Sequence, residues 1–239
     1  MTNNSVAQQL IRAVEEADSS IKLLEAVQNL AAVGLEETVP TLVAALGYNN
    51  PGAAVAAVDG LIQIGEPAVQ PLLELIDNFN YGARAWAVRA LAGIGDPRGI
   101  DTLLDAAKND FALSVRRAAA RGLGTVRWQE LTPEAAQISQ QQALEVLMQV
   151  CQDSEWVVRY AAVTGLEALA VAVNSRQSTL INSAIGQLEQ MANMDGEVAI
   201  RARAWMALHQ LQVEVGDNKT LKSNMEEVEL PNRGSGRRV

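Results

Sequence analysis

Residues 80–96, NYGARAWAVRALAGIGD, decide the fold. The apolar residues of this stretch recur at the spacing of an amphipathic helix, and the stretch closes on a glycine followed by an aspartate. On a helical wheel Val88 lies with Arg84 in one broad apolar sector, whereas Trp86 and Arg89 lie on the opposite side. One face is therefore expected to pack, and the other carries an aromatic ring and a cation with no packing role.

Shifted copies of this helix recur along the chain at intervals of about 31 residues and, later, of just over 40, which is the length of a helical hairpin. Few aromatic residues and many alanines favour an all-α chain. We predict second helices over 52–64, 82–94, 114–126, 156–170 and 199–211, and first helices containing 40–46, 69–76, 100–107, 143–151 and 185–192.

This organisation resembles HEAT and armadillo-like repeats, on the segments LIQIGEPAV, LAGIGDPRGI and NDFALSVRR. The resemblance covers about residues 20–212. It implies an α-solenoid of helical hairpins wound into a right-handed superhelix, with second helices lining the concave face.

An arginine recurs one turn into four of the predicted second helices, and an Asn or Asp precedes each by six residues. The arginines are Arg84, Arg116, Arg159 and Arg201, and the residues before them are Asn78, Asp110, Asp153 and Asp195. We interpret the pattern as a structural ladder. Each turn carboxylate caps a second helix, and each arginine bonds the acid of a neighbouring repeat.

The chain is expected to form a single repeat domain over residues 1–215, with helices at 5–17 and 20–34 as its N-terminal cap. Insertions at 127–142 and 171–184 interrupt the period and are expected to project as loops, the first with a short helix of its own from Pro133. Residues 216–239 are polar and aperiodic, so we expect them to be disordered.

Composition excludes several classes of function. A net charge of −9 argues against nucleic acid or an anionic membrane as the main partner, and no apolar run is long enough to span a membrane. One cysteine, Cys151, and one histidine, His209, exclude a Cys/His zinc site, so no metal is expected. Cys151 is predicted to be a buried structural thiol and His209 a helix-surface residue. We expect a cytoplasmic protein.

Three charged residues fall on one line across adjacent repeats of the predicted concave face: Asp59, Arg89 and Arg121. Trp86 stands one turn from Arg89. An acid, two cations and a flat ring among small residues suit a planar ligand with two carboxylates. The alternative is a solvated charged face with salt bridges between repeats.

Further aromatic and amide side chains lie on the same part of the repeat array. Tyr48, Asn49 and Trp128 are expected at the rim of the groove, whereas Trp156 and Tyr160 are expected to be packing residues.

Longer runs of the chain are similar to the F-type subunits of the cyanobacterial E/F-type bilin lyases over residues 1–212. They are LGYNNPGAAVAAVDGLIQIGEPAV, FNYGARAWAVRALAGIGDPRGIDTLL, DFALSVRRAAARGLGTVRW and EWVVRYAAVTGL. The resemblance implies a heterodimer with an E-type helical-repeat subunit. It also implies attachment of phycocyanobilin to a cysteine of the phycocyanin α-subunit through a thioether bond, with the bilin as substrate and no cofactor.

In that hypothesis the groove holds the bilin. Arg89 and Arg121 bind its propionates, Trp86 stacks on it, and Asp59 bonds pyrrole N–H groups or donates a proton. The acceptor protein supplies the nucleophilic sulfur. The related lyase-isomerases carry a His-Cys pair in the loop that here reads YNNPG, so simple addition is expected.

A non-enzymatic adaptor or chaperone that binds phycobiliproteins, in phycobilisome degradation or pigment detachment, is the alternative function. An isolated chain could also form a homodimer through its exposed groove.

Overall fold

A computed structural model of the chain describes residues 3–77, 81–173 and 178–212. These parts contain helices and no strand. The helices are α1 (Asn3–Glu15), α2 (Ser20–Ala32), α3 (Val39–Ala45), α4 (Pro51–Ile64), α5 (Val69–Asp77), α6 (Tyr81–Ile94), α7 (Ile100–Asn109), α8 (Leu113–Leu123), α9 (Pro133–Val150), α10 (Trp156–Ala172), α11 (Ser178–Met194) and a last helix over 198–212. Short 3-10 turns lie at Glu36–Thr38, Glu66–Ala68, Pro97–Gly99 and Trp128–Glu130.

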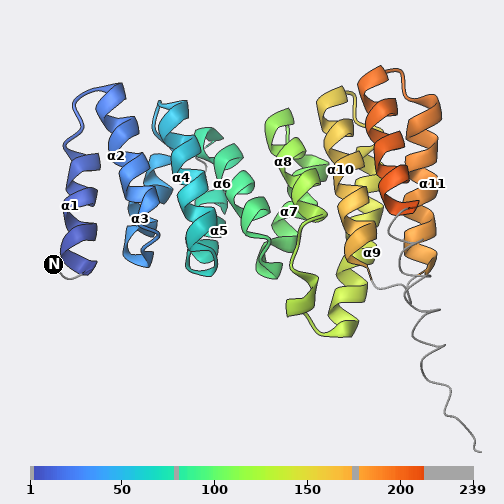
Figure 1. Ribbon diagram of the computed structural model, residues 1–239, viewed down its shortest axis with the longest axis horizontal. Helices are drawn as coiled ribbons and strands as arrows, with labels where there is room; N and C mark the ends of the chain where they lie inside the picture. The colour runs from blue at the N-terminus through green and yellow to red at the C-terminus, as the bar shows by residue number, and fades with distance from the viewer. Residues whose placement is uncertain (1–2, 78–80, 174–177, 213–239) are drawn as a thin grey trace, which may run out of the picture.

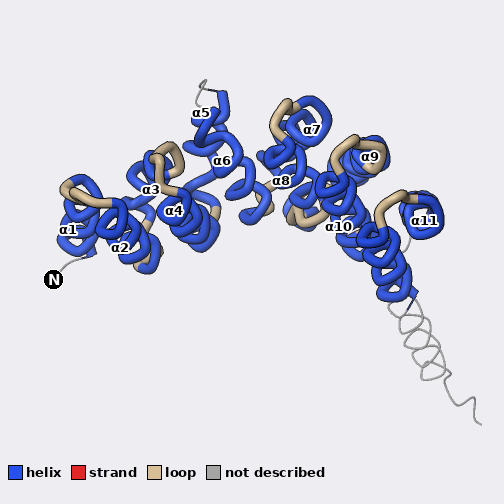
Figure 2. Tube along the Cα trace, turned by 90° about the horizontal axis from the view of Figure 1, so that it is seen from above, coloured by secondary structure: helices blue, strands red, loops and turns tan. Residues whose placement is uncertain are grey.

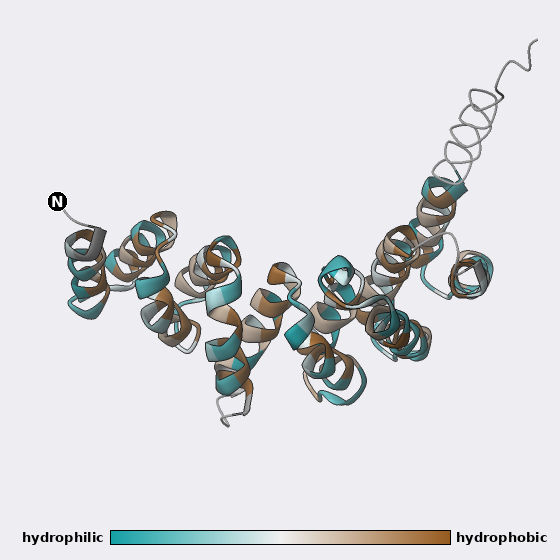
Figure 3. Ribbon diagram, turned by 90° about the horizontal axis from the view of Figure 1, so that it is seen from below, coloured by the Kyte–Doolittle hydropathy of each residue, from teal (hydrophilic) through white to brown (hydrophobic). Residues whose placement is uncertain are grey.

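The helices stand side by side in chain order as an open, curved row (Figure 1). Seen from above, α5, α7, α9 and α11 form the outer side of the curve, and α4, α6, α8 and α10 form its inner side (Figure 2). The predicted all-α solenoid of helical hairpins is confirmed, and second helices line its concave face. Hydrophobic and hydrophilic residues alternate along the helices (Figure 3), as expected for a row in which only neighbours pack.

Helix α6 shows how the decisive stretch folds. Its packing sector is buried as predicted, with Val88 and Leu91 at most 1% exposed. The helix ends at Gly95, whose N–H donates to Leu91 O at 2.9 Å and whose φ is +68°. This left-handed conformation costs little only for glycine. The chain then turns directly into the next hairpin.

Glycines on three second helices bring neighbouring inner helices close together. A Cβ built on Gly60 would lie 2.6 Å from Ala31 Cβ, and one built on Gly122 would lie 2.5 Å from Ala92 Cβ. At Gly165 it would lie 2.4 Å from the carbonyl oxygen of Ala120 on α8. Such distances leave no room for a side chain, so the inner helices form a tightly spaced surface.

The two insertions lengthen helices, and the prediction that they project as loops was wrong in this respect. Thr132 caps α9 by accepting a bond from Ala135 N, and Pro133 occupies the first turn as expected. The helix then continues without a break to Val150 and forms no separate short helix. Likewise α10 extends to Ala172 and α11 begins at Ser178. The tail at 216–239 and Asn78 lie outside the described residues.

The ladder joins successive hairpins through charge-assisted hydrogen bonds. Arg116 donates from Nε and Nη2 to the two carboxylate oxygens of Asp153 at 2.7 and 3.1 Å. Arg159 repeats this geometry with Asp195 at 2.8 and 3.1 Å. Arg84 pairs with Asp110 in the same sense. Each ladder arginine in this series thus binds the acid of the hairpin that follows it.

We predicted that the ladder carboxylates cap the first turns of the second helices. This prediction was wrong for Asp110 and Asp153. Asp110 accepts instead from Ala112 N, and Asp153 from Glu155 N, both at 2.8 Å and both in the turn just before the helix. Two-residue bonds of this kind fix the turn and aim the second carboxylate oxygen at the arginine of the preceding repeat.

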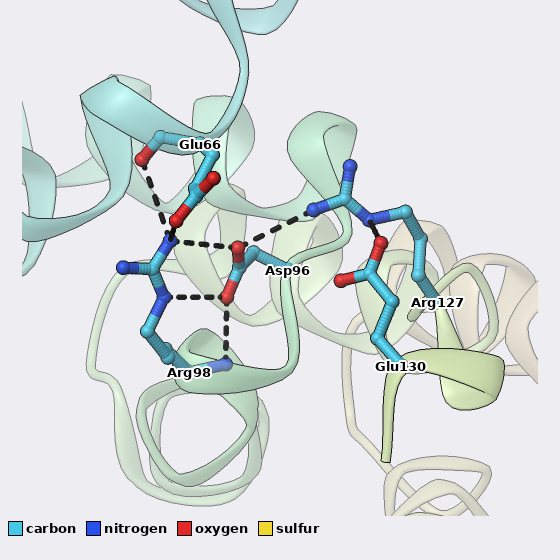
Figure 4. Close-up of polar contacts among 5 residues, drawn as sticks. All are labelled: Glu66, Asp96, Arg98, Arg127 and Glu130. Carbon is cyan, nitrogen blue, oxygen red and sulfur yellow. Dashed lines mark hydrogen bonds and ion pairs between the residues drawn. The ribbon is translucent and has the colours of Figure 1, made fainter.

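A second charged cluster holds the opposite ends of the second helices together. The buried carboxylate of Asp96 accepts from Arg98 at 2.8 and 2.9 Å and from Arg127 at 3.3 Å (Figure 4). Arg98 also reaches Glu66 of the preceding hairpin at 3.4 Å. Arg127 pairs with Glu130 at 2.8 Å. This cluster links the turns of three successive hairpins.

Acid is expected to destabilise the fold through these carboxylates. The side-chain hydrogen bond from Arg98 holds the pKa of Asp96 below its usual 3.8, against the opposing effect of burial. Burial raises the pKa of Asp153 and Asp195, but the bonds from Arg116 and Arg159 and from backbone N–H groups outweigh it, so both are lowered.

Because the folded-state pKa values are depressed, their stabilisation is fully present above about pH 4 and is lost as the pH falls through them. The urea concentration at the midpoint of unfolding, measured at pH 7, 4 and 3, should therefore decrease once the pH is below about 4. Asp195→Asn should show a shallower fall. A midpoint that is constant down to pH 3 would contradict this prediction.

Candidate functional site

Three charged side chains stand in a row on the inner face. Asp59 on α4, Arg89 on α6 and Arg121 on α8 are all exposed, and these helices pack side by side. Arg89 and Arg121 each lie five residues after a ladder arginine. Asp59 occupies the same position relative to Ala54, which takes the place of the ladder arginine in the earlier hairpin. The row is thus built by the repeat itself.

None of the three forms an ion pair with a residue in the described ranges. The salt bridges between repeats that would give this row a purely structural role are therefore not formed there. An acid and two arginines face solvent on the inner surface of an acidic chain with a net charge of −9.

Trp86 lies beside the row and is half-buried, because one side of its ring packs against the core of the N-terminal repeats. The guanidinium carbon of Arg89 lies 5.8 Å from the centre of the Trp86 ring. This cation–π contact holds the cation near the exposed edge of a flat apolar surface. The pair offers a stacking platform with a positive charge at its side.

A pocket of about 280 Å³ opens next to Trp86. It is lined by Leu46, Gly47, Tyr48, Asn49, Asn50, Pro51 and Trp86. Tyr48 and Asn49 are exposed at its edge, so the structure places both beside Trp86. A pocket of this volume can hold one or two planar rings.

Asn50 fixes the shape of the pocket loop, and this role within the YNNPG motif was not predicted from the sequence. It is 8% exposed, accepts from Ala53 N at 3.1 Å as the cap of α4, and donates to Ser20 O at 2.8 Å. The signal was present, because an asparagine before Pro-Gly marks the start of a helix. Its link to the preceding hairpin was not readable from the sequence.

Trp128 does not line the groove, and its assignment to the rim was wrong for this structure. The side chain is 5% exposed and belongs to the core of the C-terminal repeats. The opposite error concerns Trp156 and Tyr160, which were expected to pack. They are 47% and 38% exposed and lie one turn apart on α10. Helical spacing alone could not distinguish the two situations, because both sides of an inner helix carry large residues.

Cys151 is a buried thiol, as predicted. It is 2% exposed, and burial raises its pKa to about 12. Since the thiolate is the reactive form, we expect the folded protein to resist iodoacetamide at pH 8 and to become labelled only after denaturation. Mass spectrometry of native and urea-treated samples measures this difference. Rapid labelling of the native chain would contradict the buried position.

The described residues contain no cluster of His, Cys, Asp and Glu that could hold a metal ion. In the same parts of the chain, no helix is long and apolar enough to cross a membrane.

Comparison with known proteins identifies the family. The HEAT-repeat profile matches residues 69–167. The chain is 56% identical to the phycocyanobilin lyase subunit beta of Pseudanabaena tenuis, over 89% of this chain and 76% of that protein. It belongs to the phycocyanobilin lyase subunit family. Another member, the phycocyanin alpha phycocyanobilin lyase CpcF of Synechocystis, is 59% identical over 71% of this chain and 81% of its own length.

A solved structure agrees with this assignment to the lyase subunit family. The complex of CpcE and CpcF of phycocyanin lyase from Nostoc contains a chain that matches with a TM-score of 0.65 and 48% identity. The match covers 72% of this chain and 98% of that one.

Proposed function

We propose that the chain is the F-type subunit of a heterodimeric bilin lyase. With an E-type partner it attaches phycocyanobilin to a cysteine of the phycocyanin α-subunit through a thioether bond, in the cytoplasm of a cyanobacterium. The bilin is the substrate, and no cofactor takes part. The likeness to CpcF and to a solved CpcE–CpcF complex supports this proposal.

The observation that carries the proposal is the Trp86–Arg89 pair, beside the pocket that Trp86 and the turn between α3 and α4 line. A bilin is flat, carries two propionates and has pyrrole N–H groups. Trp86 and Tyr48 offer surfaces for its rings, with Asn49 at the pocket edge. Arg89 and Arg121 stand on adjacent helices as partners for the two carboxylates, and arginine suits such pairs because its donors form a planar fork.

Asp59 completes the row as the residue that faces the pyrrole nitrogens. Its carboxylate can accept pyrrole N–H bonds and pass a proton to or from the bilin. In the reaction, the acceptor cysteine adds across the exocyclic C=C bond of the bilin. The S–C bond forms, the C=C π bond breaks, and the thiol proton is delivered to the neighbouring carbon, so no oxidant or reductant is needed.

The chain itself supplies position and shielding. Holding the bilin extended along the inner face exposes one end of it to the acceptor thiol, and the ring surfaces exclude water and competing nucleophiles. Cys151 does not compete for the bilin because it is buried.

Reconstitution tests the proposal. Phycocyanobilin and apo-phycocyanin α are incubated with this chain, with an E-type subunit, and with both, and the acceptor is then denatured in acidic urea. Covalent colour is expected only with both subunits. An adaptor or chaperone would instead bind the α-subunit and leave it without covalent colour, and that result would exclude the lyase function.

A further inference from the structure

The ladder ends in the last hairpin, where one edge of the Arg201 guanidinium has no carboxylate partner in the described part of the chain. Inside the solenoid each arginine has two roles. Arg116 and Arg159 donate from Nη1 to two carbonyl oxygens of their own turn, at 2.9–3.2 Å. The other edge of each guanidinium, Nε and Nη2, holds the aspartate of the next hairpin.

Arg201 also donates to carbonyl oxygens of its own turn, but it binds no aspartate of a following hairpin in the described residues. Its Nη1 donates to Asp195 O at 2.7 Å and to Gly196 O at 3.2 Å, so its guanidinium is held in the same pose. Over residues 3–77, 81–173 and 178–212, its Nε and Nη2 have no acceptor. The donor edge that inner repeats use for a carboxylate is therefore open and already oriented.

Trp205, one turn further along the last helix, also differs from its counterparts in the interior repeats, because it is exposed and they are buried. The residues four positions after the inner ladder arginines are Val88, Ala120 and Val163, and all are fully buried. Trp205 occupies this position in the last helix and is 56% exposed. The same repeat position is thus buried in the core in three repeats and carries a large, exposed aromatic side chain in the fourth.

The opposite end of the solenoid carries mostly polar exposed side chains, with Ile21 of α2 as its exposed large hydrophobic residue. The exposed residues of α1 and α2 include Gln8, Gln9, Arg12, Glu15, Lys22, Glu25 and Gln28. Polar outer faces of this kind seal terminal repeats against further stacking. The two ends therefore differ, and a head-to-tail contact between copies would set Trp205 against a polar face.

We propose that the face formed by Arg201 and Trp205 docks a helical hairpin of a partner chain, whose inter-helix turn presents an Asp or Glu carboxylate to Arg201. The interior repeats support this choice, because a hairpin with an acidic turn covers every equivalent face. Residues 213–239 follow directly, but their apolar residues recur at helical spacing only over Leu221, Met225 and Val228, which suits one short helix and not the two-helix hairpin that covers the interior faces. The identity of the partner rests on the proposed function, under which it is the E-type subunit.

Measured association with an E-type subunit tests the proposal on the full chain. Arginine and tryptophan are the side chains that most often dominate binding at interfaces. Trp205→Ala is expected to raise the Kd about thirtyfold, and Arg201→Ala by at least about tenfold. Trp156→Ala is the matched control, because it removes an indole of similar exposure, 47% against 56%, from another helix, and its Kd should stay within about twofold of wild type.

Folding and alternative occupants are separated by two further measurements. Trp205→Ala should keep its helical circular dichroism and unfolding midpoint, since the side chain is exposed. Hydrogen exchange over 198–212 in the full chain should slow when the E-type subunit is added. Slow exchange without the partner would mean that the tail or a second copy covers the face, and this would overturn the proposal.

The docking proposal and the lyase function can fail separately. A Trp205→Ala chain that binds the E-type subunit as tightly as wild type overturns the docking face, even if pigment attachment proceeds. Weakened binding, with attachment restored at saturating partner concentration, supports it. A wild-type pair that assembles through this face without attaching pigment would refute the lyase function alone.

Discussion

Replacing Arg116 by alanine is expected to lower the free energy of unfolding by about 3 kcal/mol. Arg116 and Asp153 are 14% and 13% exposed, and the pair joins two hairpins by two parallel hydrogen bonds. Removing the arginine leaves the carboxylate largely buried without its cation and frees the turn carbonyls that Nη1 had satisfied. Urea denaturation followed by circular dichroism measures the loss.

The neighbouring Arg117 gives a matched control. It is exposed and makes no ion pair with any residue in the described ranges, so Arg117→Ala should change stability by less than about 0.5 kcal/mol. A double-mutant cycle with Asp153→Ala should show strong coupling to Arg116 only. Equal and small losses in both arginine variants would mean that the ladder does not hold the hairpins together.

Replacing Arg89 by alanine is expected to slow pigment attachment about thirtyfold. The variant loses one carboxylate partner and the cation beside the Trp86 ring. A hydrogen bond to a charged group contributes roughly 2 kcal/mol, and each 1.36 kcal/mol corresponds to a factor of ten in rate. The initial rate of covalent colour formation, measured with the E-type subunit at saturation, reports the change.

Arg12→Ala removes the same charge from the exposed surface of α1, far along the chain from the row, and should leave the rate unchanged. Arg89→Ala should keep its helicity, because the side chain is exposed. Equal rates for wild type and Arg89→Ala would remove this residue from the bilin site. Equal slowing by Arg12→Ala would show that net charge, and not position, is responsible.

The repeat made most of the fold predictable. Helical periodicity and the glycines after the earlier second helices predicted the hairpins, and the recurring Asp and Arg predicted the ladder. The insertions were misjudged, because a break in the period does not say whether extra residues form a loop or extend a helix. Thr132 and Pro133 correctly marked a helix start, but where that helix ends depends on packing against α10 and α7.

The site was predictable to the extent that it follows the repeat. Asp59, Arg89 and Arg121 share one position in the hairpin, so their alignment could be anticipated. Trp128 and Trp156 could not be placed, because both lie where the repeat period changes. An error of one or two residues in the alignment of the repeats there moves a side chain from the predicted groove to the predicted core. The partnership of Trp86 with the loop at 46–51 needed the three-dimensional structure.

The mass of the phycocyanin α-subunit after reaction tests the central claim most directly. Apo-α is incubated with phycocyanobilin, an E-type subunit and this chain, and its intact mass is measured after denaturation. We predict a gain of one phycocyanobilin, lost when this chain is omitted and strongly reduced when Trp86 and Arg89 are both alanine. An unchanged mass with the full mixture, or the same gain without this chain, would contradict the account.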